Sequence, residues 1–243
     1  MTQPQQGTFY GVGVGPGDPE LLTLKAVRVL RHSDAIYVPV SRLSRQNHVA
    51  DIAAAYASAE CEVVRVSFSL GGHTVTRQQH WHETAQEIAG RLQVGQDVTL
   101  VTLGDALLYS THIYLLRALY AVFPKAKVET VPGISAVSTA AALTQYPLGE
   151  GEQPLSIIPA ANDVKKLRDL ITSGSGVAIM KIGHRLPQLI KLLDQCHALE
   201  RSVFVARAGL PEQRIELDLV QLCNAPADIG NLAVILVAPK CDR

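Results

Sequence analysis

The fold is decided near the start of the chain, by the stretch TFYGVGVGPGD at residues 8–18. Residues 8–14 combine β-branched, aromatic and glycine residues, and they predict a strand. Gly-Pro-Gly at residues 15–17 predicts a tight turn. Asp18 and Pro19 then predict the cap and the first position of a helix that ends near residue 32. A strand that passes through a glycine turn into a helix is typical of an α/β domain.

The glycines of this turn do not have the spacing of a dinucleotide-binding loop. Counted from Gly11 the sixth position is Pro16, and counted from Gly13 it is Asp18, so the pattern G-x-G-x-x-G is absent. The glycines instead indicate a backbone that passes close to a neighbour or takes a positive φ. Either a turn that packs a helix on a sheet or a loop that lines a cleft would require them.

Strand and helix patterns alternate along the rest of the first half. We therefore expect a largely parallel sheet with both faces covered. The polar and basic residues 41–48 (SRLSRQNH) indicate a loop or the start of a helix. The expected strands are residues 35–38, 61–68, 97–102 and 128–131, and the expected helices are residues 76–92, 111–122 and 135–143.

A second domain is expected after a break in this pattern. Residues 145–153 (QYPLGEGEQ) are rich in Gly, Pro and Glu and predict an interdomain linker. We expect two α/β domains, at residues 1–146 and 147–243, with a ligand cleft between them. The second should hold strands at residues 155–158, 176–180, 203–206, 213–217 and 232–237, the last two antiparallel, and helices from 162 or 163 and over 186–197.

Composition argues against several classes of protein. Lys plus Arg and Asp plus Glu number 22 each, and a formal net charge of zero disfavours a nucleic-acid partner. No apolar run has the length of a membrane span, and residues 1–10 lack the pattern of a signal peptide. The four cysteines and eight histidines have neither disulfide nor metal-ligand spacing. We therefore expect a cytoplasmic protein without a metal site.

Two further turns have the character of binding segments, because ligands of parallel sheets bind beyond the carboxyl ends of strands. The first is LGDALLYS at residues 103–110, where Gly104 would let a ligand approach and Asp105 would supply a charge. Asp105 could instead only cap the next helix, although Ser110 is better placed for that. The second is VPGISA at residues 131–136, which leads into a helix of small residues.

Together these segments resemble a known family. The motifs are V-G-x-G-P-G-D-P-E-L-L-T at residues 12–23, G-D-x-L-L-Y-S-T at 104–111 and V-P-G-I-S-A at 131–136, with A-I-M at 178–180 and A-G-L-P-E-Q-R at 208–214. In this order they resemble the tetrapyrrole (corrin and porphyrin) methylases. The resemblance covers almost the whole chain, and it implies a homodimer that holds S-adenosyl-L-methionine between its two α/β domains.

The resemblance also implies roles for single residues. Pro16 belongs to the glycine-rich loop, which in the family lines the tetrapyrrole cleft. Met180 should lie against the adenine of the cofactor, with Ala208 nearby. The remaining residues implied to contact the cofactor are Leu103, Gly104, Asp105, Leu108, Ser110, Ser135 and Ala136.

Residues 108–115 resemble the subgroup that methylates carbon 20 of precorrin-2 or of its cobalt form, which implies precorrin-3A as product. Asp105 is our candidate for the base that removes the carbon-20 proton, because it follows a strand beside the expected methyl donor. Arg42, Arg45 and His48 could anchor the substrate's carboxylates, or could lie on a solvated loop. Ala106 departs from the proline usual in the family, so we expect this turn to be less rigid than in other members.

Other readings stay open from the sequence alone. Metal-free and cobalt-containing precorrin-2 cannot be told apart, and methylation could occur at another tetrapyrrole position. A dinucleotide-dependent oxidoreductase is disfavoured by the glycine spacing. The alternative from a different class is a tetrapyrrole-binding domain without catalytic activity.

Overall fold

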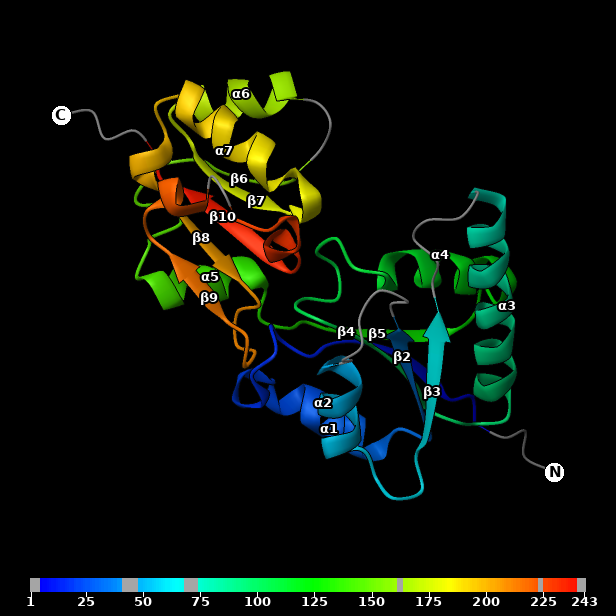
Figure 1. The fold of residues 1–243 in the computed structure, drawn as a ribbon. Coiled ribbons are helices and arrows are strands. Elements are labelled where there is room, and N and C mark those ends of the chain that lie inside the picture. The colour runs from blue at the N-terminus through cyan, green and yellow to red at the C-terminus, as the bar shows by residue number, and fades with distance from the viewer. Residues whose placement is uncertain (1–4, 41–47, 68–73, 161–163, 223–224, 240–243) are drawn as a thin grey trace. The chain divides into compact units, whose positions relative to one another are not determined.

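The computed structural model describes residues 5–40, 48–67, 74–160, 164–222 and 225–239, and it divides into two compact units, Met1–Ser135 and Ala136–Arg243 (Figure 1). Each unit is an α/β sandwich around its own sheet, so the expected fold class is confirmed. None of the described helices is both long and apolar enough to cross a bilayer.

The first unit has a five-stranded sheet in the order β3-β2-β4-β1-β5. All its pairings are parallel, as the alternation of strands and helices predicted. The central strand β4 is buried along its whole length. The strands are β1 (Thr8–Gly13), β2 (Ala35–Val40), β3 (Glu62–Ser67), β4 (Val98–Thr102) and β5 (Lys127–Val131).

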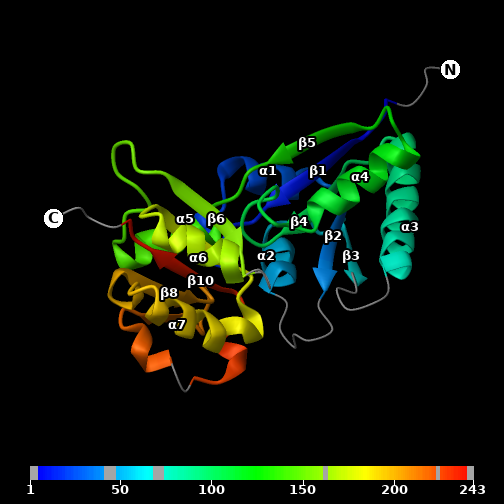
Figure 2. The ribbon, with the colours of Figure 1, turned by 90° about the horizontal axis from the view of Figure 1, so that it is seen from above.

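In the part of this unit that the structure describes, four α-helices cover the sheet, two on each face. Apolar side chains of α1 and α2 pack on one face with Val12, Ile36 and Val101. Those of α3 and α4 pack on the other with Phe9 and Leu100, and Figure 2 shows α3 and α4 side by side. The helices are α1 (Leu24–His32), α2 (His48–Tyr56), α3 (Thr74–Gln93) and α4 (His112–Val122).

The helix expected from Pro19 to residue 32 is interrupted. Asp18 does cap a turn, because its Oδ1 accepts from the Glu20 amide at 2.9 Å, but that turn is only the 3-10 helix Pro19–Leu21. Helix α1 has its own N-cap, Thr23, whose Oγ1 accepts from the Ala26 amide at 3.1 Å. A second good cap residue in the sequence therefore moves the start of the helix five residues further along.

The second unit has a mixed sheet in the order β6-β7-β10-β8-β9. β6 and β7 are parallel, whereas β10 is antiparallel to β7 and β8, and β9 is antiparallel to β8. The last two strands of the chain are thus each antiparallel to the strands beside them, as expected. The strands are β6 (Leu155–Pro159), β7 (Gly176–Met180), β8 (Ser202–Ala206), β9 (Arg214–Glu216) and β10 (Ala233–Val237).

The helices of this unit lie on both faces of its sheet. The helices α6 (Val164–Thr172) and α7 (Leu186–Gln195) pack on one face. Helix α5 (Ala136–Thr144) packs on the other, through Val137 and Ala140. Short 3-10 helices span Gly183–Arg185, Leu199–Arg201, Leu219–Leu222 and Ala227–Gly230.

The second unit begins before the domain boundary that we expected at residue 146. Helix α5 packs on β8 and β10, and the hydroxyl of Tyr146 accepts from the Ala238 amide at 2.9 Å and donates to the Arg201 carbonyl. The Gly- and Pro-rich residues 145–153 therefore lie inside the second unit instead of linking two domains.

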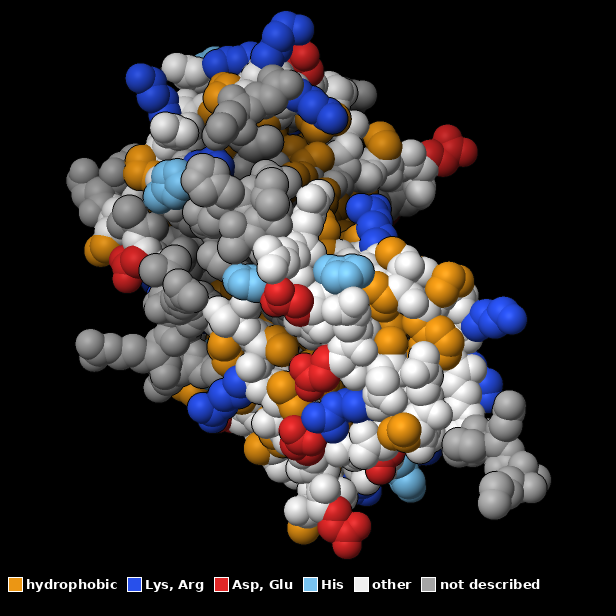
Figure 3. Space-filling model, turned by 90° about the vertical axis from the view of Figure 1, so that its right-hand side faces the viewer, with side chains coloured by type: hydrophobic (Ala, Val, Ile, Leu, Met, Phe, Trp, Pro, Cys, Tyr) orange, Lys and Arg blue, Asp and Glu red, His pale blue; other side chains and the backbone are white. Residues whose placement is uncertain are grey.

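The outer face of α3 and α4 exposes aromatic side chains. Trp81 of α3 stacks on Tyr114 of α4 with ring centroids 5.8 Å apart, and Tyr114 and Tyr120 are exposed. Figure 3, which faces this side, shows apolar side chains among polar and charged ones. This surface therefore exposes aromatic side chains to solvent.

Candidate functional site

Three glycines meet where the neighbouring strands β4, β1 and β5 end. A Cβ atom on Gly13 would lie 2.6 Å from the Gly104 carbonyl oxygen and 2.7 Å from the Gly133 nitrogen. These distances are shorter than real Cβ contacts, and the obstructing atoms are backbone. The three strand ends can therefore approach one another only because Gly13 and Gly133 have no side chain.

The glycine-rich loop after β1 is bonded to the loop after β4. The Gly15 amide donates to the Gly104 carbonyl at 3.2 Å, the Gly104 amide donates back at 2.6 Å, and the Val14 amide donates to Thr102 at 2.9 Å. Gly15 and Gly104 both have positive φ, 77° and 76°. Close backbone approach, which the glycines predicted, is confirmed.

These bonds also bear on the dinucleotide reading. A phosphate nest needs free backbone amides, and the Val14 and Gly15 amides are already engaged. The nearest α-helix begins only at Leu24 and is capped by a threonine side chain. The loop therefore lacks the helix N-terminus that holds a pyrophosphate in dinucleotide folds. Pro16 is buried within it.

Asp105 joins two of the loops. Its Oδ1 accepts from the Leu107 amide of its own loop at 2.8 Å, and its Oδ2 accepts from the Gly133 amide of the loop after β5 at 3.1 Å. Neither Asp105 nor Ser110 caps the next helix, because α4 begins at His112 after Thr111 without a side-chain cap bond. The cap role considered for these two residues is therefore wrong.

The loop at residues 103–110 is held although Ala106 replaces the proline usual in the resembling family. The Ser110 hydroxyl donates to the Ala106 carbonyl, and both residues are buried. Tyr109 takes a left-handed backbone conformation with φ 52°. Leu107 and Tyr109 are exposed at 54% and 37%, so apolar side chains face outward from a loop fixed by hydrogen bonds.

His112 lies under this loop, and sequence reasoning missed it. Its ring occupies the space where Gly11 would carry a Cβ atom, lies tilted against the Phe9 ring with centroids 5.7 Å apart, and places Nε2 3.3 Å from Thr130 Oγ1. Burial lowers the pKa of His112 to about 4. The available signal was Gly11, because a glycine inside a strand marks the close approach of another group.

In the second unit, three of the expected cofactor residues lie in one apolar cluster. Ala136 begins α5, Met180 ends β7, and Ala208 follows β8, and all three pack with Val137 and Ala178. Met180 is half-buried. A partly exposed apolar surface of small residues and a methionine is chemically suited to a flat, weakly polar ring such as adenine.

The expected site residues thus form two groups. The structure brings together the first-unit residues at the carboxyl ends of β1, β4 and β5, and the second-unit residues in their own cluster. The chain passes from one unit to the other between Ser135 and Ala136. Residues 41–47, which include Arg42 and Arg45, lie outside the described residues, and His48 begins α2.

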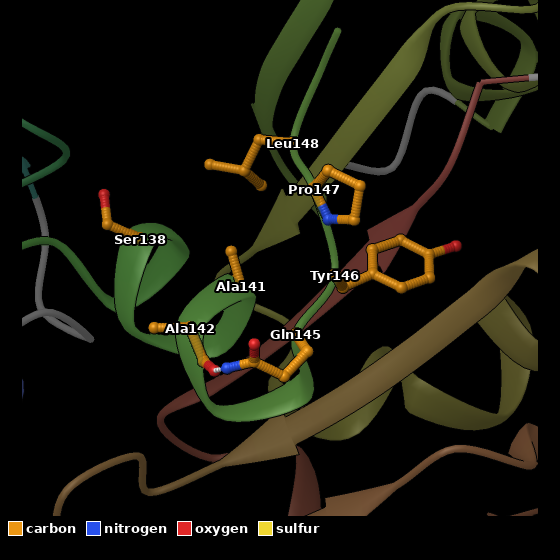
Figure 4. A pocket seen from close by; sticks show the side chains of 7 residues that line it. All are labelled: Ser138, Ala141, Ala142, Gln145, Tyr146, Pro147 and Leu148. Atoms are coloured by element: carbon orange, nitrogen blue, oxygen red, sulfur yellow. Dashed lines mark hydrogen bonds between the residues drawn. The ribbon is translucent and has the colours of Figure 1, made fainter.

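A separate groove of about 430 Å³ lies along α5. Ser138, Ala141 and Ala142 line one side, and the chain from Gln145 to Leu148 lines the other (Figure 4). It contains none of the expected site residues. Among the described residues, no three His, Cys, Asp or Glu side chains are placed to hold a metal ion.

Comparison with known families decides the classification of this arrangement. A model of the tetrapyrrole (corrin/porphyrin) methylases matches residues 8–222. The chain belongs to the tetrapyrrole methylase family. Solved structures agree with this fold. A cobalt precorrin-4 methyltransferase superposes on it with a TM-score of 0.75 at 24% identity, and the match covers 95% of this chain and 94% of that one.

Other tetrapyrrole methylases resemble the chain in sequence. The cobalt-precorrin-2 C(20)-methyltransferase of Salmonella typhimurium is 28% identical over 208 residues, which are 86% of each protein. The precorrin-2 C(20)-methyltransferase of a Sinorhizobium species is 30% identical over 211 residues, 84% of this chain and 85% of the relative. A uroporphyrin-III C-methyltransferase of Thermus thermophilus, solved with S-adenosyl homocysteine, has a TM-score of 0.67 at 21% identity and covers 96% of this chain and 97% of its own.

Proposed function

We propose that the chain is an S-adenosyl-L-methionine-dependent C-methyltransferase that methylates carbon 20 of precorrin-2, giving precorrin-3A in cobalamin biosynthesis. The observation that carries this proposal is the similarity to two relatives named as carbon-20 methyltransferases, over about six-sevenths of both chains. The motif at residues 108–115 supports the same subgroup.

The cofactor site that we propose combines the two groups of residues. Leu103, Gly104, Asp105, Leu108 and Ser110, with Pro16 and Ser135, would hold the amino-acid and ribose part, and Ala136, Met180 and Ala208 would hold the adenine. Two observations support this assignment. Ala136 and Met180 are half-buried against an apolar cluster that includes Ala208, and the cofactor has no phosphate that would need the engaged amides of Val14 and Gly15.

The cofactor, when bound, supplies an electrophilic methyl group on a sulfonium. The chain's contribution is then mainly to hold the reacting carbon in line with that methyl group, and such positioning can be equivalent to effective molarities of about 10⁵ M or more. The amide hydrogen bonds that Asp105 accepts and the bond that Ser110 donates fix the loop that would do this.

A proton must leave carbon 20 after the transfer, and Asp105 remains our candidate acceptor. Each of its oxygens already accepts one backbone amide, and each retains a second lone pair. Asp105 would therefore combine the two roles of fixing the loop and taking the proton.

One experiment tests the reaction. The purified protein is incubated with precorrin-2 or with cobalt-precorrin-2 and cofactor carrying a ¹³C-methyl group, and the product is examined by NMR. We expect one new methyl signal at carbon 20. A product methylated elsewhere would contradict the position, and binding without any methylated product would indicate a non-catalytic domain. The macrocycle that reacts faster shows whether the substrate is metal-free precorrin-2 or its cobalt form. The two relatives are named for different forms and so leave this open.

We also propose a cytoplasmic homodimer. The exposed Tyr114 and Tyr120 on the outer face of α4 support a dimer, because they offer apolar surface for a second copy. Light scattering after gel filtration should give twice the chain mass of 26.2 kDa. A mass of one chain would contradict the dimer.

A further inference from the structure

Two cations lie at one edge of the sheet in the second unit. Lys181 directly follows β7 and Arg207 directly follows β8. β10 lies between these strands and runs antiparallel to both, so its start shares this edge with their ends (Figure 1). The Arg207 amide donates to the carbonyl of Leu232, the residue before β10, at 2.9 Å.

The backbone at this edge is left-handed at three adjoining positions. Lys181, Arg207 and Leu232 have φ of 56°, 50° and 52°. Side chains disfavour this conformation, and asparagine, aspartate or glycine usually occupy it. Such conformations persist only where the surrounding structure enforces them, and they cluster at functional sites.

The same local arrangement occurs twice. In Lys181-Ile182-Gly183 and in Arg207-Ala208-Gly209 the cation is followed by a buried apolar residue and then by a glycine with positive φ, 52° and 76° respectively. Burial of Ile182 and Ala208 fixes each turn from inside, which leaves the preceding cation at the edge. Lys181 is exposed and Arg207 is half-buried.

Neither cation has a counter-charge. Ion pairs of the second unit join Lys165 to Asp169 and Arg214 to Glu216, and neither pair includes Lys181 or Arg207. Within the part of the chain that the structure describes, no carboxylate pairs with Lys181 or Arg207. Two unneutralised cations on strained, internally anchored turns are a natural site for anionic groups of a ligand.

We propose that Lys181 and Arg207 bind carboxylate side chains at the rim of the tetrapyrrole substrate, a step that rests on the proposed function. One strand separates the two residues, so their backbones are roughly 10 Å apart. That separation suits two carboxylates at different positions of a large ring. Each cation is also the chain neighbour of a proposed cofactor residue, Met180 or Ala208.

The test measures binding of a stable ring that carries eight carboxylates. Uroporphyrin III is titrated into the full chain and followed by its fluorescence, for the wild type and for Lys181→Gln and Arg207→Gln. We expect each variant to raise the Kd about tenfold, the effect of one lost charged hydrogen bond. Lys191→Gln, which removes one exposed charge from α7, should leave the Kd unchanged. For coproporphyrin III, which has four carboxylates, the two glutamine variants should raise the Kd by a smaller factor than they do for uroporphyrin III.

Two further arms make the result decisive. The Kd for S-adenosyl-L-homocysteine should stay within twofold, and a selective loss of its affinity would assign the cations to the cofactor carboxylate and overturn the proposal. Lys181→Arg and Arg207→Lys keep the charge and should bind the ring nearly as the wild type does, which separates charge from folding. An unchanged ring Kd in both glutamine variants would also overturn the proposal.

This outcome is independent of the reaction itself. A wild type that methylates carbon 20 while both glutamine variants keep its ring affinity refutes only the role of the two cations. A wild type that forms no methylated product, but binds the ring through Lys181 and Arg207, refutes only the proposed reaction.

Discussion

The carboxylate of Asp105 accepts the backbone amide of Gly133, with Oδ2 and N 3.1 Å apart. This bond joins the loop after β4 to the loop after β5, although β1 lies between those two strands in the sheet. It spans the position where Gly13 packs against Gly104 and Gly133. The shape of the candidate site in the first unit therefore depends on one side chain and three glycines.

Replacing Asp105 by asparagine should destabilise the loop and therefore weaken cofactor binding. An asparagine can accept only one of the two amides and presents an N–H group to the other, so we expect a loss of about 1–3 kcal/mol in the free energy of unfolding. Urea unfolding and calorimetric titration with S-adenosyl-L-homocysteine measure the two effects. Asp218→Asn is the matched control, because Asp218 accepts the Val220 amide at 3.0 Å in a similar turn.

The same variant tests Asp105 as the proton acceptor. With both ligands saturating, loss of a general base should lower turnover by about a hundredfold or more. Turnover within a few-fold of the wild type would remove the base role and leave Asp105 as a positioning residue.

Alanine at Gly133 should separate the loops. Its Cβ would meet the backbone of Gly13 and Gly104, so we expect a loss of about 1–3 kcal/mol in the free energy of unfolding together with weaker cofactor binding. Gly90→Ala is the control, because nothing lies within 4 Å of a Cβ there. Alanine in that helix should stabilise by roughly 0.5–1 kcal/mol. Equal effects of the two substitutions would contradict the packing of the strand ends.

Gly11 and His112 should be energetically coupled. Gly11→Ala alone would place a methyl group into the buried imidazole ring, whereas His112→Ala removes that ring. The double variant should therefore be more stable than the sum of the two single effects predicts, by about 1–3 kcal/mol. Urea unfolding of all four proteins measures the coupling, and additive effects would show that the ring is not held over Gly11.

Stability should depend on pH through His112. Burial lowers its pKa from 6.5 to about 4, so between these values the unfolded chain binds a proton that the folded chain does not. The free energy of unfolding should therefore fall as the pH drops from about 6.5 to about 4, by on the order of 3 kcal/mol, and this contribution should level off below pH 4. Comparing wild type with His112→Gln isolates it. Identical pH profiles would contradict a neutral, buried histidine.

Met180→Ala should weaken cofactor binding more than it weakens the fold. The side chain is half-buried beside Ala136 and Ala208, so its removal costs apolar contact with a bound adenine, about 1.5 kcal/mol or tenfold in Kd. Leu217→Ala, at a residue that is 65% exposed, should leave the Kd unchanged. A normal Kd in Met180→Ala would exclude Met180 from the site.

Much of the fold was predictable because turns and apolar runs are local signals. Strands β1 to β10 all fall within or beside the expected ranges. The interruption at residues 22–23 was not foreseen, because Asp18 and Thr23 are both good caps and only packing selects the helix start. The place of α5 was not foreseen either, because a helix of small residues shows no sign of which sheet it will cover.

The site was predictable as segments but not as contacts. The three glycine turns follow strands, which is visible in the sequence. The bond that the Gly133 amide donates to Asp105 depends on the strand order β4-β1-β5, and that order pairs strands far apart in the chain. His112 was missed because its partner is a strand glycine about 100 residues earlier.

A crystal structure with S-adenosyl-L-homocysteine tests the central claim most directly. We predict the adenine against Ala136, Met180 and Ala208, and the amino-acid part on the loop at residues 103–110. Cofactor bound elsewhere, or a nucleotide phosphate held by the glycine-rich loop at residues 11–17, would contradict it.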